Sequence, residues 1–359
     1  MTSQVVVAQV LLFFIILLLR SLACWARLDA AVILPHGDFA YDPLLVDVPV
    51  ERRAATRIAA ASRRVGHLFL HEHVDPEVIF LITPHGIALS HDFGVYLGEK
   101  AWGYADIGAD LHRPNSTQYR VSLPDPIALA PVLAQDLLDY IIEESSTGRN
   151  MNVTGIKTSA DESQNMPLQW AEVIPLLLVL DDDNKNIGTT TTQTATIPSA
   201  PVQRQHIIWS QPLRRFGEYE GADMVKELLR LGQTLFDWME QRPERMAVLV
   251  SADLSHTHRK DGPYGYSATS QPFDDFIGKW AHKDPCRNAK VLLEQATTLQ
   301  PTALSCGYTG MVMLHGMLCG EDRRQLDRCW VSKVLVDKNV TYYGMMAAMI
   351  KRVDKVKAE

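Results

Sequence analysis

Three short hydrophobic runs along the chain each end abruptly in a polar turn that carries a histidine. The runs and their histidines are Val32–Leu34 with His36, Val78–Ile82 with His85, and Ala247–Val250 with His256 and His258. Apolar runs of this length, bounded by Pro, Gly and polar residues, are typical of buried strands. In open α/β sheets ligands bind beyond the carboxyl ends of the strands, so we expect these histidines to meet at one site.

Between these runs, stretches with apolar residues at helical spacing alternate with short continuous apolar runs. Apolar residues at helical spacing predict helices over 51–64, 125–144, 224–240, 273–282, 289–298 and 310–318. Further apolar runs predict strands over 93–97, 174–180, 206–209, 331–336 and 342–350. Strands that alternate with helices predict a single α/β domain, with a central, mostly parallel sheet flanked by helices.

Two stretches fall outside this alternation. Residues 1–28 form an apolar N-terminal segment, and its core, Val5–Leu19, is shorter than the roughly 20 residues of a membrane span. A membrane anchor or signal peptide and an extension that packs on the fold both remain open. Within the α/β domain at 29–359, the low-complexity insertion at 181–205 has too few large apolar residues to fold, so we expect it to be disordered.

The net charge and the cysteine content narrow the class of protein and its location. The net charge of −7 comes with no basic patch, which argues against a nucleic-acid partner. The five cysteines are odd in number and form no CxxC pair. We therefore expect no disulfide framework and a reducing, cytoplasmic location. Membrane anchoring through residues 5–19, or entry into the secretory pathway, is the alternative.

The histidines suggest a metal. Neutral imidazole is a good ligand for iron, copper and zinc, so His36 and His85 are candidate metal ligands. Asp253 precedes His256 by three residues on a strand-end turn, where its carboxylate could orient the imidazole. With His258 close by, the sequence predicts proton transfer beside the metal by Asp253, His256 and His258.

The third ligand is open at this stage. Cys306 lies in Ser305-Cys306-Gly307 near the head of an apolar helix, where helix-end N–H groups favour a thiolate. A carboxylate would instead complete the triad of the non-haem iron oxygenases. The candidate carboxylates are Asp38, Asp42, Glu172, Asp274 and Asp275.

Taken in order, these motifs resemble a known superfamily. They are Leu34-Pro35-His36-Gly37, Thr83-Pro84-His85-Gly86, Ser251-Ala252-Asp253-Leu254-Ser255-His256, Ser305-Cys306-Gly307 and Tyr342-Tyr343-Gly344-Met345. Residues 30–350 resemble the class III extradiol ring-cleavage dioxygenases, which have the LigB-like fold, and the related Memo family. The resemblance implies an α/β fold with a mononuclear metal site at one end, and members often form homodimers.

The resemblance also assigns roles. It implies that His36 and His85 bind the metal, that Cys306 completes the site as in Memo proteins, and that Asp253 and His256 lie beside it. Two dioxygenase features are missing. Pro272, rather than the expected glutamate ligand, precedes Phe273-Asp274, and no acid/base histidine precedes Pro175-Leu176.

Two functions follow from the resemblance. The first is an Fe²⁺-dependent dioxygenase that acts on a catechol-like aromatic with O₂, with His256 moving protons. The second is a Memo-like metal-binding protein with a redox or signalling role, and a softer site that suits copper or zinc. The third ligand, Cys306 or a carboxylate, distinguishes them. A zinc hydrolase needs only an activated water and a base, and is the third interpretation.

Overall fold

The structure, a computed structural model, describes residues 28–73, 75–108, 118–146, 151–159, 161, 164–180, 204–216, 220–320 and 329–353. The apolar segment at 5–19 and most of the predicted insertion at 181–205 lie outside these residues. Gln205, the last residue of the predicted insertion, belongs to a strand. In the described part of the chain no helix combines the length and apolarity needed to cross a membrane.

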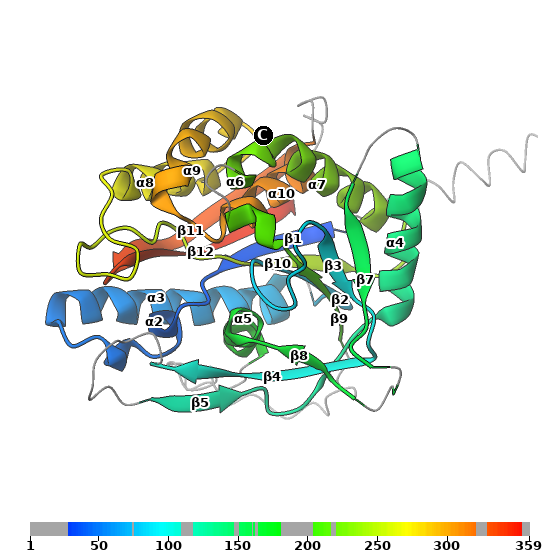
Figure 1. Ribbon diagram of the computed structural model, residues 1–359, viewed down its shortest axis with the longest axis horizontal. Coiled ribbons are helices and arrows are strands. Elements are labelled where there is room, and N and C mark those ends of the chain that lie inside the picture. The colour runs from blue at the N-terminus through cyan, green and yellow to red at the C-terminus, as the bar shows by residue number, and fades with distance from the viewer. Residues whose placement is uncertain are drawn as a thin grey trace, which may run out of the picture.

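Eight strands form one mixed sheet in the order β11-β12-β1-β10-β2-β9-β3-β7 (Figure 1). The strands are β1 (Leu28–Leu34), β2 (Val78–Thr83), β3 (Phe93–Tyr96), β7 (Val153–Ile156), β9 (Gln205–Ser210), β10 (Met246–Ser251), β11 (Cys329–Val340) and β12 (Tyr343–Val353). The four central strands β1, β10, β2 and β9 run parallel, as predicted. Towards the edges of the sheet, β12 pairs antiparallel with β1 and β3 pairs antiparallel with β9.

Helices cover both faces of this sheet (Figure 1). They are α2 (Asp38–Tyr41), η1 (Pro43–Leu45), α3 (Pro49–His67), η2 (Leu68–His73), α4 (Pro131–Ser146), α5 (Trp170–Leu180), η4 (Leu213–Phe216), α6 (Glu220–Asp223), α7 (Val225–Met239), α8 (Ser270–Ala281), η5 (Val291–Ala296), α9 (Thr297–Ala303) and α10 (Tyr308–Cys319). On one face α4, α7, α8 and α10 form a large core, and on the other α3 and α5 form a second one.

A small second sheet lies outside α5 (Figure 1). Its strands are β4 (Lys100–Ile107), β5 (Tyr119–Ser122), β6 (Ile127–Ala128) and β8 (Met166–Leu168). Alternate residues of β4 are buried and join the core around α5. Helix α5 is thus enclosed between two sheets.

The continuous hydrophobic runs of the central strands follow from burial on both faces. Along β2, Phe80 and Ile82 point into the core around α7 and α10, while Ile79 and Leu81 point into the core around α3 and α5. All six residues of β2 and of β10 are buried. Such strands show no alternation of polar and apolar residues, which is how the sequence indicated a central sheet.

The prediction of a strand over 174–180 is wrong, because these residues form most of α5. A helix enclosed on all sides is apolar all round, so its periodicity is lost and it looks like a buried strand. Pro175 was the signal against a strand, since a central strand cannot accommodate the missing N–H. The helix predicted over 125–144 also begins later, at Pro131, after the short strand β6.

We expected no disulfide framework, but the structure contains one disulfide among its described cysteines. Cys286 follows α8, Cys319 ends α10, and the two form a disulfide although 33 residues separate them in sequence. The fold brings their Cα atoms to 5.4 Å, within the range that a disulfide spans. A count of cysteines could not reveal this pairing, because it depends on how the two helices pack.

Candidate metal centre

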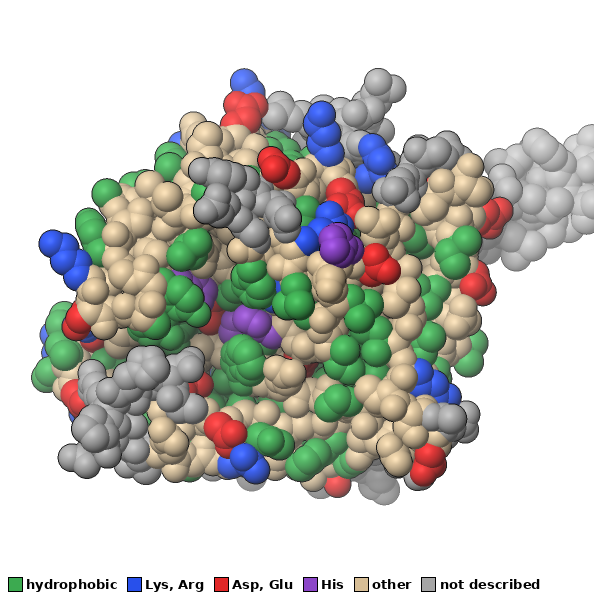
Figure 2. Space-filling model, viewed as in Figure 1, with side chains coloured by type: hydrophobic (Ala, Val, Ile, Leu, Met, Phe, Trp, Pro, Cys, Tyr) green, Lys and Arg blue, Asp and Glu red, His purple; other side chains and the backbone are tan. Residues whose placement is uncertain are grey.

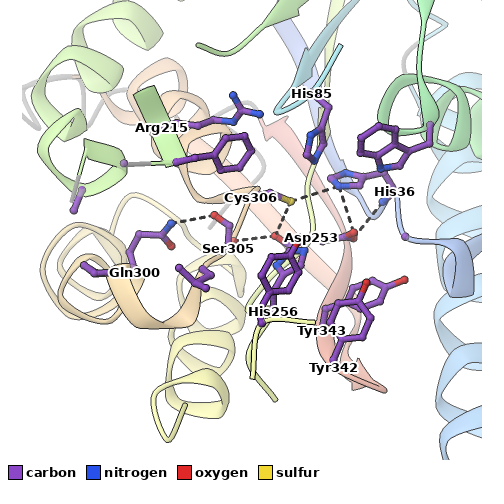
Figure 3. Close-up of a pocket in the computed structure, with 18 of the residues that line it drawn as sticks. His36, His85, Arg215, Asp253, His256, Gln300, Ser305, Cys306, Tyr342 and Tyr343 are labelled. Carbon is purple, nitrogen blue, oxygen red and sulfur yellow. Dashed lines mark hydrogen bonds and ion pairs between the residues drawn. The ribbon is translucent and has the colours of Figure 1, made fainter. Parts of the chain in front are cut away.

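The carboxyl ends of three adjacent parallel strands meet at one point of the molecule (Figure 3). His36 follows β1, His85 follows β2, and Asp253 and His256 follow β10, which lies between them. Cys306 comes from a different part of the fold, two residues before α10 begins. The strand-end rule therefore predicted the location of the four polar residues correctly.

Both Pro-His-Gly turns require their glycine. A side chain at Gly37 would collide with the ring of Tyr343, which packs directly over that backbone. Gly86 has a φ of +83°, and a side chain there would meet the hydroxyl of Tyr96 and the carboxylate of Glu172. Each glycine thus allows a close approach that positions the preceding histidine.

Two overlapping sets of metal-ligand atoms converge here. One donor atom each of His36, His85 and Cys306 lie within 4.8 Å of one another, and so do those of Asp253, His256 and Cys306. The Cys306 Sγ is 3.4 Å from His36 Nε2. The rings of His36 and His85 meet edge to face with centroids 5.2 Å apart. Cys306 is common to both sets and is therefore the central donor.

Asp253 makes contacts other than those predicted. Its carboxylate accepts the backbone N–H of His36 at 3.2 Å and lies 3.3 Å from His36 Nε2. His256 instead donates from Nδ1 to the carbonyl of Leu254 at 2.9 Å, which leaves its Nε2 without a proton in the neutral ring. At Nδ1 of His256 a carbonyl in the same turn thus takes the orienting role that we predicted for Asp253.

Burial keeps the three histidines neutral. It lowers the pKa of His36 well below its usual value, that of His85 to about 3 and that of His256 to about 4. The charge of Arg215 lowers the pKa of His36 and His85 further, whereas carbonyl contacts oppose the shift at His256. Neutral imidazoles offer lone pairs, which is the form that binds a metal.

The same burial acts in the opposite direction on Cys306. It raises the pKa of the thiol well above its usual value, and the nearby negative charge of Asp253 raises it further. Backbone hydrogen bonds and Arg215 oppose this shift but do not overcome it. The helix end and Arg215 therefore do not by themselves favour the thiolate of Cys306, and a bound metal ion would have to displace the thiol proton.

A cavity of about 490 Å³ opens onto these residues, and histidine side chains are visible in a hollow rimmed by hydrophobic groups (Figure 2). Its walls are strongly aromatic, with Trp170, Phe216, Tyr264, Tyr342 and Tyr343 among the lining residues. His256 stacks on Tyr343 with centroids 5.7 Å apart, and His85 lies 4.7 Å from Trp170. The cavity suits a small, flat molecule.

Arg215 was not predicted from the sequence. It is 5% exposed, lines the cavity, donates from Nη1 to the carbonyls of Gln211 and Pro212, and stacks 3.8 Å from the ring of Phe216. Gln211-Pro212-Leu213-Arg214-Arg215-Phe216 contains no recognisable motif. Only the fold, which returns η4 to the strand ends, reveals that a buried cation lies beside the donors.

The structure does not bring His258 to the cavity. Its Nε2 lies 2.7 Å from Asp274 Oδ2, and this buried pair sits behind the site. Glu172 is also turned away, since it accepts hydrogen bonds from Thr83 Oγ1 and from the backbone of Gln169. Of the other candidate carboxylates, Asp38 lines the cavity, whereas Asp42 and Asp275 do not.

Comparison with known proteins gives little guidance. No family model matches the chain. A protein of Clostridium acetobutylicum named "Protein CA_C1420" is 42% identical over 48 residues, which are 13% of this chain and 10% of that protein. A crystal structure of the uncharacterized protein JW3007 from Escherichia coli K12 aligns with 89% of this chain and 99% of its own, at a TM-score of 0.46 and 14% identity. Neither protein carries a described activity in its name.

Proposed function

We propose that this protein binds one metal ion through His36, His85 and Cys306 and uses it to oxidise a small aromatic molecule. The observation that carries this proposal is the convergence of the three donor atoms within 4.8 Å beside an aromatic cavity. Two neutral imidazoles and a thiol are a donor set for transition metals and not for magnesium or calcium.

Fe²⁺ is the metal we propose first, with copper and zinc as competitors because the thiol softens the site. Bound Fe²⁺ would supply Lewis acidity towards phenolic oxygens and electrons towards O₂. Asp253 belongs to the overlapping donor set, so its carboxylate could serve as a ligand beside Cys306 or in its place. The donor set therefore fits the proposed metal.

The remaining residues of the cavity support a reaction on an aromatic ring. Trp170, Tyr264 and Tyr343 provide flat apolar surfaces that would orient the ring and exclude water. His256, with its proton on Nδ1, has an unprotonated Nε2 that could accept a phenolic proton. The proposed reaction is the O₂-dependent opening of a catechol-like ring, in which both atoms of O₂ enter the product.

A Memo-like metal-binding role without ring cleavage is the second candidate. Two observations favour it: Cys306 is common to both donor sets, and Trp170 stands ahead of Pro175 where a dioxygenase would have its acid/base histidine. A copper or zinc ion held by His36, His85 and Cys306 would suit that role.

Metal content and oxygen uptake test both candidates. We would purify wild type, Cys306→Ala and, as a control, His206→Gln without added metal, and measure bound metal and catechol-dependent O₂ consumption. His206 is a suitable control because it is buried on β9 and does not line the cavity. We expect iron and O₂ consumption in wild type and in His206→Gln, and loss of iron in Cys306→Ala.

Other outcomes are equally informative. Copper or zinc that disappears with Cys306, without O₂ consumption, would support the Memo-like role and contradict the dioxygenase. Iron retained by Cys306→Ala would remove Cys306 from the ligand set in favour of Asp253. The absence of metal from wild type, even after incubation with Fe²⁺, would overturn both proposals.

A further inference from the structure

Ser251, the last residue of β10, links the metal centre to helix α5. It is fully buried, and its Oγ lies 2.5 Å from the carbonyl oxygen of Ala171 and 2.9 Å from His36 Nδ1. The hydroxyl therefore stands between a backbone acceptor on one side and an imidazole on the other. It is not one of the residues that line the cavity.

The position of the hydroxyl proton follows from its two neighbours. A carbonyl oxygen can only accept a hydrogen bond, so the single proton of Ser251 points to Ala171. The serine oxygen must then accept the hydrogen bond from His36, which places the imidazole proton on Nδ1.

The carbonyl of Ala171 is available because of Pro175. In an α-helix the N–H four residues later would bond this carbonyl, but residue 175 has no N–H. The proline in α5 thus leaves an acceptor inside the fold, and Ser251 uses it. Without that acceptor the hydroxyl could turn its proton towards His36.

A neutral His36 with its proton on Nδ1 has a lone pair on Nε2. This nitrogen faces Cys306 Sγ at 3.4 Å and the carboxylate of Asp253 at 3.3 Å. The alternative tautomer would donate from Nε2 to Asp253 and would use up the nitrogen that a metal needs. A hydrogen bond from Nε2 to the buried carboxylate of Asp253 would be favourable, so another contact must stabilise the Nδ1–H tautomer.

We propose that Ser251 is a positioning residue that holds the proton of His36 on Nδ1 and so keeps Nε2 free to bind the metal. The inference rests on the proposed metal site and adds to it the residue that prepares its most buried ligand. Ser251 touches neither substrate nor metal; it acts through His36. Hydrogen bonds of this kind from outside the ligand shell commonly change metal affinity about 10- to 100-fold.

The direct test is to observe the tautomer. We would label the full-length protein with ¹⁵N-histidine, remove metal with a chelator, and record long-range ¹H–¹⁵N correlation spectra. His36→Gln assigns the signals of His36 among the 12 histidines of the chain. We expect the Nδ1–H form in wild type and the Nε2–H form in Ser251→Ala.

Ser210→Ala is the matched control. Ser210 also ends a parallel strand, is 1% exposed and donates to a backbone carbonyl, that of Ile87, but it makes no hydrogen bond with a histidine in the described part of the chain. Both alanine variants lose a buried hydrogen bond to a backbone carbonyl, and Ser251→Ala also loses the contact with His36, so only Ser251→Ala should change the tautomer. Ser251→Thr retains a hydroxyl and should restore the Nδ1–H form.

Zinc affinity, measured by competition with a chelator, gives the functional readout. We expect Ser251→Ala to bind Zn²⁺ about 10- to 100-fold more weakly than wild type, and Ser210→Ala and Ser251→Thr to remain close to wild type. An Nε2–H form in wild type, an unchanged Nδ1–H form in Ser251→Ala, or unchanged affinity in that variant would overturn the inference.

The tautomer is read without metal, so the two proposals can fail separately. If wild type binds no Zn²⁺, Fe²⁺ or Cu²⁺ yet shows the expected tautomers, the proposed metal function is wrong and Ser251 has no ligand to prepare. If wild type binds metal and the tautomer does not respond to Ser251→Ala, the metal function stands and only the role of Ser251 fails.

Discussion

His36 and His85 end two strands that flank β10 in the same Pro-His-Gly turn, yet the fold holds their rings differently. The ring of His36 is 2% exposed, and both of its nitrogens face defined partners. The ring of His85 makes no hydrogen bond with the described part of the chain and is held by the faces of Trp170 and Phe216. One candidate ligand is fixed by polar contacts, the other by apolar walls.

The difference comes from the hydroxyl groups at the strand ends. Ser251 of β10 accepts from the ring of His36. Thr83 of β2 accepts only the backbone N–H of His85 and donates its proton to Glu172. The same turn motif therefore yields one pre-oriented ring and one adaptable ring. We infer that His36 anchors the metal and that His85 adjusts when a ligand enters the cavity.

The largest effect should separate the two histidines directly. Removing the pre-oriented ligand in His36→Ala should weaken Zn²⁺ binding by more than about 100-fold, because loss of a ligand exceeds loss of its supporting hydrogen bond. His85→Ala should weaken Zn²⁺ binding about 10-fold less than His36→Ala does, since binding by His85 must also order its ring. Chelator competition measures both, and equal losses would contradict the comparison.

The pH dependence of metal binding should isolate Cys306 from the histidines. Burial lowers the pKa of His85 to about 3 and that of His256 to about 4, so neither takes up protons near neutral pH. The pKa of Cys306 is raised, so a metal must displace one proton from the thiol.

Zn²⁺ affinity should therefore increase about tenfold per pH unit between about pH 5 and 8, and this slope should vanish in Cys306→Ala. Isothermal titration in buffers of different protonation enthalpy would count the released proton independently. A slope of two or more would mean that a histidine titrates as well.

A smaller effect should appear when the apolar wall of His85 is removed. Trp170→Ala should free that ring without touching His36 and weaken Zn²⁺ binding roughly two- to tenfold, the cost of ordering one side chain. Trp102→Ala is the control, because Trp102 is similarly exposed, at 37% against 39%, but lies on β4 away from the cavity. A change in the His36 tautomer in Trp170→Ala would show that the two rings are coupled.

The smallest effect on metal binding is expected from Thr83→Val. The variant removes the side-chain donor of Glu172 but leaves the bond from the backbone of Gln169, and should lower the free energy of unfolding by about 1–3 kcal/mol. It should also raise the pKa of Glu172 further above about 7, since the lost hydrogen bond favours the carboxylate. The His36 tautomer should stay unchanged, in contrast to Ser251→Ala. Denaturant unfolding and the ¹⁵N spectra measure the two effects.

Much of the site could be predicted because strand ends are local features. Short apolar runs closed by Pro, His and Gly gave His36 and His85, and Asp253 and His256 followed from the third run by the same rule. The parallel centre of the sheet followed equally from runs that are buried on both faces. These features depend on a few consecutive residues and on a general rule of α/β folds.

The remainder depends on contacts that no local pattern encodes. Helix α5 looked like a strand because two sheets enclose it, and Arg215 carried no signal before η4 was brought to the strand ends. His258 lies two residues from His256 but pairs with Asp274 of α8, because that helix packs behind the turn. In each case the deciding partner lies on another element.

Pro175 has a consequence for how the molecule opens. A proline within a helix disfavours it by about 3 kcal/mol, so α5 cannot persist without the sheets that enclose it. If α5 detaches, Ser251 loses its acceptor and no longer holds the proton of His36 on Nδ1. Amide hydrogen exchange of α5 and spontaneous metal release should therefore depend on the same cooperative opening of the structure. The rate of metal loss would then measure the rate of local unfolding of α5.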